Sequence, residues 1–341
     1  MSALVCIRPD CCADRVRVAG WMGAAAIGLY AFDYRFDAAG NRTQLTKNGE
    51  TTYYEYNTLN QLTLERSTAG ALTYYQWQAD GALERQQDAR GTTYFTWDVD
   101  ESLKGIATPA GSLRNAYDAE MKRVWREEDS AVTYFAFDDE KLVLSRPVQG
   151  AATHFVSEGP SVYDALVAHR LESDPATQAW YLPDALGTTL GLTGGAGLLT
   201  DTFLYEAFGN TLHSSGIGGD PYNYVGAYGY YQDTFALHLL WHRWYDAAAG
   251  RFGSRPQGGR QGVGAYRYVR GKPTRRIAPR GGRRDPCAGL KDTIDTLADQ
   301  VQGQWDGSRF PPSCQALNDQ LYRYLNCKYG FTAGPAKRYR P

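Results

Sequence analysis

The sequence has few of the residues from which metal sites and disulfide scaffolds are built. Its 341 residues include six cysteines, five histidines and three methionines. The cysteines stand in two terminal groups without a Cys-x-x-Cys pair, which argues against a zinc site and leaves too few for a disulfide-based fold. Ser214 and Ser215, which we expect in the glycine-rich loop LHSSGIGGD, lack the G-x-S-x-G elbow. The glycine cluster GLTGGAG lacks the Lys-Ser/Thr of a phosphate loop. We therefore predict no catalytic, cofactor-binding or metal-binding residues.

No apolar run reaches the length of a transmembrane helix. The stretch VAGWMGAAAIGLYAF follows Arg15 and Arg17, as the core of a signal peptide would. Asp10 and Asp14 spoil the positive flank, however, and no clear cleavage site precedes DYRFD. We predict strand sequence here, or translated sequence around an internal start site, and leave residues 1–29 as an undefined N-terminal segment.

Tyrosine (25) and glycine (37) are abundant, which favours many short strands joined by tight turns. Charge is unevenly distributed: residues 251–284 hold eleven lysines and arginines and no acid. That leaves 25 basic and 37 acidic residues elsewhere, a net of −12. A basic stretch with interleaved tyrosines is typical of weak polyanion binding. The alternative, which we prefer, is that core strands lost their acids by drift.

The middle of the chain contains an internal repeat. Alternating residues such as Thr52, Tyr54 and Tyr56 can point to one face of a strand, and a polar turn follows. Each unit therefore predicts a β-hairpin whose turn is held by an acid or amide side chain, and stacked hairpins build a sheet that grows in one dimension. An aromatic residue followed by a polar one recurs every 20 or 21 residues, at Phe36-Asp37, Tyr56-Asn57, Trp77-Gln78, Trp97-Asp98, Tyr117-Asp118 and Phe137-Asp138.

The stretch FDYRFDAAGNRTQLTKNGETTYYEYNTLNQLT resembles the YD repeat of RHS (rearrangement hotspot) and teneurin-type proteins. YLPDALGTTLGLT, YEAFGN, YNYVGAYGYYQDTFALHLLWHRWYDAAAGRF and YRYVRGKPTRRIAPRGG then follow in the order of the RHS-associated core domain. The resemblance implies a mainly β fold, in which a spiral β-sheet closes as a hollow shell, often around a C-terminal toxin segment. We expect YD repeats over residues 30–175 and the core domain over 176–282. With so few repeats the shell should be partial, with an unpaired strand edge near residues 30–45.

In this family two aspartates and an arginine of the core cut the chain before its variable C-terminal region. Carried over residue by residue, Arg243 in HRWYD matches the arginine. Arg255 stands where the first Asp-Pro pair has its acid, Ala278 where the second has it, and Gly282 replaces the leucine expected before the cut. One carboxyl must act as base while the other stays protonated as acid. We therefore predict that this core does not cut itself.

Two other sets of residues nearby offer little alternative chemistry. Asp233 and Asp246 match turn positions of the family, so we do not predict that they form a substitute pair. His238 and His242 would share a face of the strand that the motif implies, ~13 Å apart at about 3.3 Å per residue, too far to chelate one ion.

After RRDP the composition changes, and residues 283–341 form the variable C-terminal region and tail. Apolar residues at three- and four-residue spacing predict two helices in a hairpin, which would bring Cys287 near Cys327; whether they pair stays open. The hairpin shows no paired acids and no His-based nuclease set. We expect it to cap the shell or to dock a partner.

Together these observations predict an RHS-type scaffold or encapsulation protein of a polymorphic-toxin or cell-surface system, and not an enzyme. The expected partners are another RHS-type chain that completes the shell, or a secretion-system component, with no small-molecule substrate. The family implies a secreted or cell-surface location. Two alternatives remain: a toxin effector whose C-terminal hairpin is the payload, and a polyanion-binding surface protein acting through residues 251–284.

Overall fold

The computed structural model describes residues 16–20 (backbone only), 30–159, 163–216, 218–256, 264–274 and 276–278. The chain divides into two compact units, Met1–Gly282 and Arg283–Pro341. The second unit lies outside the described residues, and so do the predicted helical hairpin and all six cysteines. Within the described residues, no helix is long and apolar enough to span a membrane.

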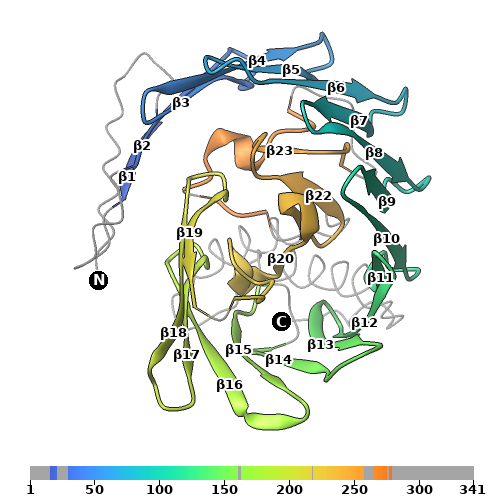
Figure 1. Ribbon diagram of the computed structural model, residues 1–341, viewed down its shortest axis with the longest axis vertical. Coiled ribbons are helices and arrows are strands. Elements are labelled where there is room, and N and C mark those ends of the chain that lie inside the picture. The colour runs from blue at the N-terminus through green and yellow to red at the C-terminus, as the bar shows by residue number, and fades with distance from the viewer. Residues whose placement is uncertain are drawn as a thin grey trace, which may run out of the picture. The chain divides into compact units, whose positions relative to one another are not determined.

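The first unit is mainly β, which confirms the predicted fold class. In its described part, nineteen strands form one sheet in which each strand pairs antiparallel with the next in the chain (Figure 1). The strands are β1 (Val16–Gly20), β2 (Tyr30–Phe36), β3 (Arg42–Lys47), β4 (Glu50–Tyr56), β5 (Leu62–Ser67), β6 (Leu72–Trp77), β7 (Leu83–Asp88), β8 (Gly91–Trp97), β9 (Leu103–Thr108), β10 (Gly111–Tyr117), β11 (Arg123–Glu128), β12 (Ala131–Asp138), β13 (Lys141–Pro147), β14 (Thr153–Ser157), β15 (Leu166–Leu171), β16 (Asp174–Pro183), β17 (Thr189–Gly194), β18 (Leu199–Tyr205) and β19 (Thr211–Ser215).

A second, four-stranded sheet and three 3₁₀ turns follow in the chain, and the strands of the large sheet lie around them in Figure 1. These elements are η1 (Gly226–Tyr228), β20 (Tyr230–Gln232), η2 (Thr234–Ala236), β21 (Leu237–Leu240), β22 (Arg243–Asp246), β23 (Arg251–Phe252) and η3 (Val269–Gly271).

Every repeat carries a β-bulge at its second aromatic residue. In the second repeat Glu55 pairs with Leu64 but Tyr56 pairs with Leu62, so one residue of β5 is left over. A bulge bends its strand and increases the local twist, so a bulge in each repeat curves the sheet in one sense. The same shift occurs directly before Phe36, Trp77, Trp97, Tyr117 and Phe137.

In four of the six repeats the polar residue after the aromatic holds the turn, as the sequence predicts. Asn57 Oδ1 accepts hydrogen bonds from the backbone N–H groups of Leu59 and Gln61, at 2.9 and 3.0 Å. Asp118 Oδ1 does the same for the equivalent two residues of its own turn. These bonds replace the ladder bonds that the chain loses where it reverses.

The bulges also explain why the repeated aromatic is mostly tyrosine or tryptophan. At four of the bulges the carbonyl of the residue opposite accepts a hydrogen bond from the aromatic side chain of the next repeat, so these repeats are tied to their neighbours by part-buried polar contacts. The bonds run from Tyr56 to Arg42 (2.7 Å), from Trp77 to Leu62 (2.7 Å), from Trp97 to Leu83 (2.6 Å) and from Tyr117 to Leu103 (2.9 Å).

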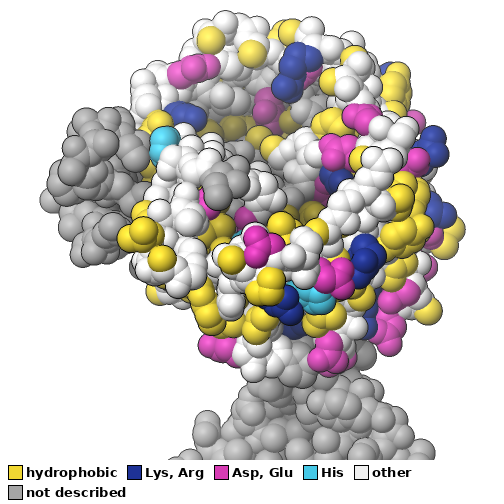
Figure 2. All heavy atoms as spheres, turned by 60° about the horizontal axis from the view of Figure 1, so that its bottom comes forward, with side chains coloured by type: hydrophobic (Ala, Val, Ile, Leu, Met, Phe, Trp, Pro, Cys, Tyr) yellow, Lys and Arg dark blue, Asp and Glu magenta, His cyan; other side chains and the backbone are white. Residues whose placement is uncertain are grey.

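The core lies between the two sheets. Phe32 and Tyr34 of β2 pack with Tyr230 and Tyr245 of the small sheet in one buried cluster. A second cluster joins residues of β7 to β10 with residues of β21 and β22, among them Trp244, which is 2% exposed. On the face drawn in Figure 2, charged side chains of both signs are interspersed with hydrophobic ones.

Two sequence-based expectations about the sheet are wrong. Residues 30–45 are not a free edge, because β1 pairs with β2 with Val16 opposite Tyr34, and β2 pairs with β3. In the described pairings the outermost strands are β1 and β19. Ser214 and Ser215 lie in β19 rather than in a glycine-rich loop.

Candidate functional site

Arg243 of β22, the residue that matches the family arginine, is buried and fully engaged with the backbone around it. Its Nη2 donates hydrogen bonds to the carbonyls of Ser254 and Ala265, the latter at 2.7 Å. Its guanidinium carbon lies 3.6 Å from the ring centre of Phe252. Burial lowers the pKa of Arg243 to about 9. The side chain therefore fastens the segment after β23.

The two positions that replace the family's acids contact two different tyrosines. Arg255 Nε donates to Tyr266 Oη at 3.3 Å, and the backbone N–H of Ala278 donates to Tyr230 Oη at 2.7 Å. Within the described residues no hydrogen bond or ion pair joins these two positions. A guanidinium and a methyl group supply neither the base nor the acid that the carboxyl pair would provide.

The basic stretch packs against the turns of the repeats. At five of the six repeated aromatics the fourth residue that follows has a positive φ, for example 60° at Asn60 and 97° at Gly81. The carbonyls of these two residues accept hydrogen bonds from Arg251 and Tyr266. A β-carbon at Gly81 would lie 2.1 Å from Arg255 Nε. These turns thus present carbonyl groups to donors of the core domain, and two of the arginines in residues 251–284 lie against them.

Arg42 of β3 makes the opposite connection, from the large sheet into the core domain. It is 4% exposed, its Nη2 donates to the carbonyl of Ala248, and its guanidinium carbon lies 4.4 Å from the ring centre of Tyr54. In the other direction, Arg251 Nη1 of β23 donates a hydrogen bond to Asn41 Oδ1 at 3.1 Å. Buried arginines in both directions therefore fix the core domain against the first repeats.

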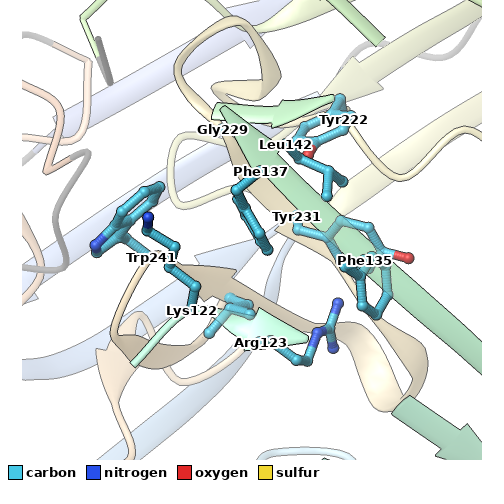
Figure 3. Close-up of a pocket in the computed structure, with 10 residues that line it drawn as sticks. Lys122, Arg123, Phe135, Phe137, Leu142, Tyr222, Gly229, Tyr231 and Trp241 are labelled. Carbon is cyan, nitrogen blue, oxygen red and sulfur yellow. The ribbon is translucent and has the colours of Figure 1, made fainter. Parts of the chain in front are cut away.

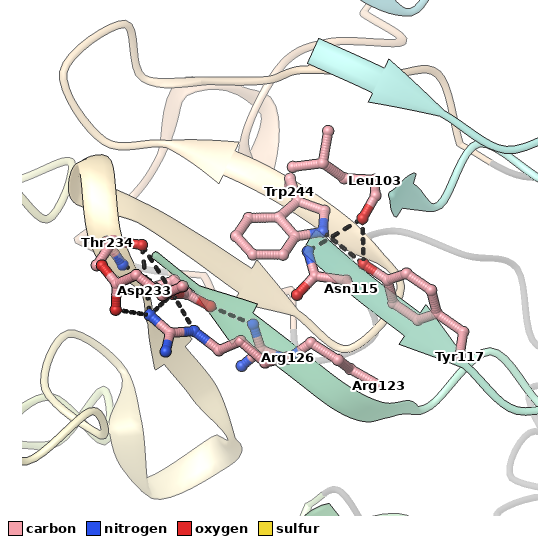
Figure 4. Close-up of polar contacts among 9 residues, drawn as sticks. Leu103, Asn115, Tyr117, Arg123, Arg126, Asp233, Thr234 and Trp244 are labelled. Atoms are coloured by element: carbon pink, nitrogen blue, oxygen red, sulfur yellow. Dashed lines mark hydrogen bonds and ion pairs between the residues drawn. The ribbon is translucent and has the colours of Figure 1, made fainter. Parts of the chain in front are cut away.

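Asp233, the N-cap of η2, lies in a buried ion-pair network (Figure 4). Its carboxylate accepts from the guanidinium of Arg123 and from Arg126 Nε, the second at 2.9 Å. Burial alone would raise the pKa of Asp233, but the two arginines and the bonds they donate hold it below its ordinary value. Asp233 therefore stays ionised and cannot serve as the protonated acid of a catalytic pair.

Asp246 lies in a different environment, beside Glu65 of β5. Burial and the charge of Asp246 raise the pKa of Glu65 to about 7, and burial also raises the pKa of Asp246. Glu65 accepts a hydrogen bond from Tyr75 Oη at 2.9 Å, and Asp246 accepts one from the N–H of Ala249 at 3.0 Å. Sequence reasoning considered Asp246 but missed Glu65, because the two acids are 181 positions apart and share no motif.

The two histidines that were expected on one strand lie on different elements. His238 is in β21 and is 1% exposed, and burial lowers its pKa to about 4. His242 follows the end of β21 in a tight turn, because Trp241 has a φ of 56° and Leu240 pairs with Arg243. The expectation that both occupy the strand is wrong.

Two cavities lie between the sheets. The larger, about 470 Å³, is lined by residues of β7 to β9, by the turn after β9, by η2 and by Asp246. The smaller, about 40 Å³, is lined by Arg123, Phe135, Tyr231 and Trp241 among others, with Lys122 at its edge (Figure 3). In the described residues no group of three or more His, Cys, Asp or Glu is placed to hold a metal ion.

Comparison with known proteins identifies the family. The sequence matches the family description Teneurin YD-shell over residues 23–260, which is more than half of the chain. The chain belongs to the Teneurin YD-shell family. The match confirms the resemblance drawn from the repeats, although no curated protein matches the sequence.

Several solved structures similar to this YD-shell chain contain TccC3. They include the Photorhabdus luminescens Tc holotoxin pore with a TccC3 variant (13% identity, 78% of this chain and 17% of that chain, TM-score 0.46). They also include TcdB2-TccC3 (13%, 78% and 18%, 0.45) and TcdB2-TccC3 without its hypervariable C-terminal region (13%, 79% and 18%, 0.43). This YD-shell chain thus spans less than a fifth of the length of each.

Proposed function

We propose that this chain is a YD-shell scaffold that encloses or presents another polypeptide segment, and that its autoproteolytic site has lost both acids. The observation that carries the proposal is the position of Arg255. A guanidinium bonded to Tyr266 Oη stands where the cutting mechanism needs a carboxyl group. Ala278, at the second position, offers only its backbone N–H, to Tyr230 Oη.

The contacts of the core domain support a structural role. Arg42 and Arg251 connect the core domain with the first repeats, and Arg123 connects β11 with Asp233. A core domain fixed at so many points can hold the curved sheet in place without any chemistry. We propose the same division that the sequence suggests, with repeats over residues 30–175, the core over 176–282 and a variable hairpin over 283–341.

The ends of the sheet suggest the class of partner. In the described pairings, β1 and β19 each have a strand on one side only, and a sheet edge is a template for another strand. We propose that another YD-shell chain or a component of a secretion system covers these edges. The family implies a secreted or cell-surface location for the assembly.

The alternative function, polyanion binding through the basic stretch 251–284, has less support than the scaffold function. Arg251 and Arg255 are engaged with the repeat turns, while Arg270, Lys272 and Arg276 are exposed. Retention on heparin that falls with salt would favour this alternative. Growth arrest on expression of residues 284–341 alone would favour a toxic hairpin.

The decisive experiment is the intact mass of the purified full chain after overnight incubation near neutral pH. We expect one species at the full mass. Two fragments that meet near residue 282 would refute the loss of the site. The Asp246→Asn variant is incubated alongside, because it would stop cutting by a substitute acid pair but not cutting by a contaminating protease.

A further inference from the structure

A compact polar cluster lies away from the core-domain arginines, where β15, β16 and the segment after β19 meet. His169 of β15 and Tyr181 of β16 approach each other with 3.0 Å between Nδ1 and Oη. Tyr181 Oη lies 2.6 Å from Asp220 Oδ2, and His169 Nδ1 lies 3.0 Å from the same oxygen. One nitrogen and two oxygens from three separate segments therefore form a small, nearly equilateral triangle.

Two hydrogen bonds account for two sides of this triangle and leave the third side without a proton. A tyrosine hydroxyl brings one proton, a single imidazole nitrogen brings at most one, and an ionised carboxylate brings none. At most two of the three short contacts can be linear hydrogen bonds. One pair of polar atoms is therefore in contact with no proton between them. A cation at the centre of the triangle would attract all three.

The triangle has the dimensions of one face of a metal site. Ligand bonds of about 2.0 to 2.2 Å to imidazole nitrogen and carboxylate oxygen, meeting at right angles, place adjacent ligand atoms about 2.9 Å apart. The three observed separations of 2.6, 3.0 and 3.0 Å are close to this value. An octahedral ion bound on one face keeps its other positions open to water or to a ligand.

The surroundings fix the three groups in place. Tyr181 is 6% exposed and the Asp220 side chain 5%, whereas the His169 side chain is 18% exposed and gives the cluster its contact with solvent. The second oxygen of Asp220 accepts from the backbone N–H of Tyr222 at 2.7 Å, which orients the carboxylate. The rings of Phe155 and Tyr181 lie 6.2 and 5.4 Å from the imidazole. Such outer contacts are what hold metal ligands in position.

We propose that His169, Tyr181 and Asp220 bind a ferric ion on one face of its coordination sphere. The set of one imidazole, one carboxylate and one phenolate combines hard oxygen ligands with a nitrogen ligand that iron accepts. Binding breaks the phenol O–H bond of Tyr181, forms an iron–oxygen bond and releases one proton to solvent.

No sequence pattern predicts this site. Its ligands are 12 and 39 positions apart, and the third is a tyrosine in a chain that has 25 of them. The site would join two strands of the large sheet to the segment that leads into the small sheet, so an ion bound there would stabilise the first unit by mass action.

The test is a titration of the full chain, first stripped with a chelator, with ferric nitrilotriacetate. We expect one equivalent to bind, a visible phenolate-to-iron charge-transfer band to appear and the unfolding temperature to rise. Tyr181→Phe should remove the band, and Asp220→Asn should weaken binding by about tenfold or more. His154→Gln, in neighbouring β14, should leave the band unchanged. A wild-type protein without the band, or an equal band in Tyr181→Phe, would overturn the proposal.

A second variant covers the case in which Tyr181→Phe does not fold. His169→Gln changes the most exposed member of the cluster and keeps a polar side chain there. It should fold, as far-UV circular dichroism would show, and should bind iron at least about tenfold more weakly. Wild-type affinity in this variant would equally overturn the proposal.

Discussion

Replacing Asp233 by asparagine should destabilise the first unit by about 3–5 kcal/mol. The side chain of Asp233 is 0% exposed, and those of its partners Arg123 and Arg126 are 3% and 13% exposed. Asparagine keeps a side-chain oxygen that can accept from the N–H of Thr234, so the cap of η2 survives and only the charge is lost. The guanidinium of Arg123 would then stay buried without its counter-charge, while Arg126 would keep its ion pair with Glu128 at 2.6 Å. A domain stable by 5–15 kcal/mol would lose about a fifth or more of that free energy.

Urea unfolding followed by tryptophan fluorescence measures this loss. The control is Arg114→Gln, which breaks an ion pair with Glu127 in which the arginine side chain is 72% exposed and should cost less than about 1 kcal/mol. The folded-state pKa of Asp233 is lowered, so its contribution is present above the ordinary value of 3.8 and fades as the pH falls through the folded value. A cost no larger than that of Arg114→Gln, at about pH 7, would show that the network does not stabilise the fold.

Three further substitutions test the fold. Glu65→Gln should stabilise the protein by ~3 kcal/mol at about pH 8, because the wild-type carboxyl is ionised there although burial raises its pKa to about 7. The gain in stability should vanish below pH 4.5, the ordinary pKa of a glutamate, where the wild-type carboxyl is neutral too. An equal gain at acid pH would contradict the assignment. Met121→Gly should stabilise the fold by about 0.5–1 kcal/mol in thermal unfolding, because Met121 has a φ of 63°, a conformation that is strained for a residue with a side chain. A loss of stability would mean that the packing of the methionine side chain outweighs the backbone strain. Tyr117→Phe should destabilise the fold by about 2 kcal/mol in urea unfolding, because its hydroxyl donates to the carbonyl of Leu103 and accepts from the indole N–H of Trp244 (Figure 4). Tyr94→Phe, at an exposed position, should be near neutral. Equal effects of the two substitutions would refute the role of the bonds made by Tyr117.

The repeat could be predicted from the sequence because its signals are local. The aromatic residue, the polar residue after it and the residue at positive φ stand within five positions of one another, and these few residues decide where the chain turns. The bulge was not predicted. It follows from the pairing of one strand with the next, where Tyr56 meets Leu62 while Glu55 meets Leu64.

The candidate sites could not be predicted in the same way. Glu65 and Asp246 become neighbours only because the core domain packs against β5, and His169 and Asp220 only because β15 lies beside the segment that follows β19. The ion pair of Arg123 with Asp233 spans 110 positions. Each pairing depends on how far the sheet curves before the chain turns inward, and this is the sum of many small bends.

The sequence by itself determined the period, the hairpins, the mainly β class and the family, and it predicts that two acids of the family's cutting site are replaced. Those are properties of single positions and of short spacings. Only the tertiary structure decided which charges are buried together, which arginines reach the repeat turns and which three polar atoms converge at β15 and β16. Burial and charge pairing are set by the neighbours of a side chain in space, and in a curved sheet those neighbours come from distant parts of the chain.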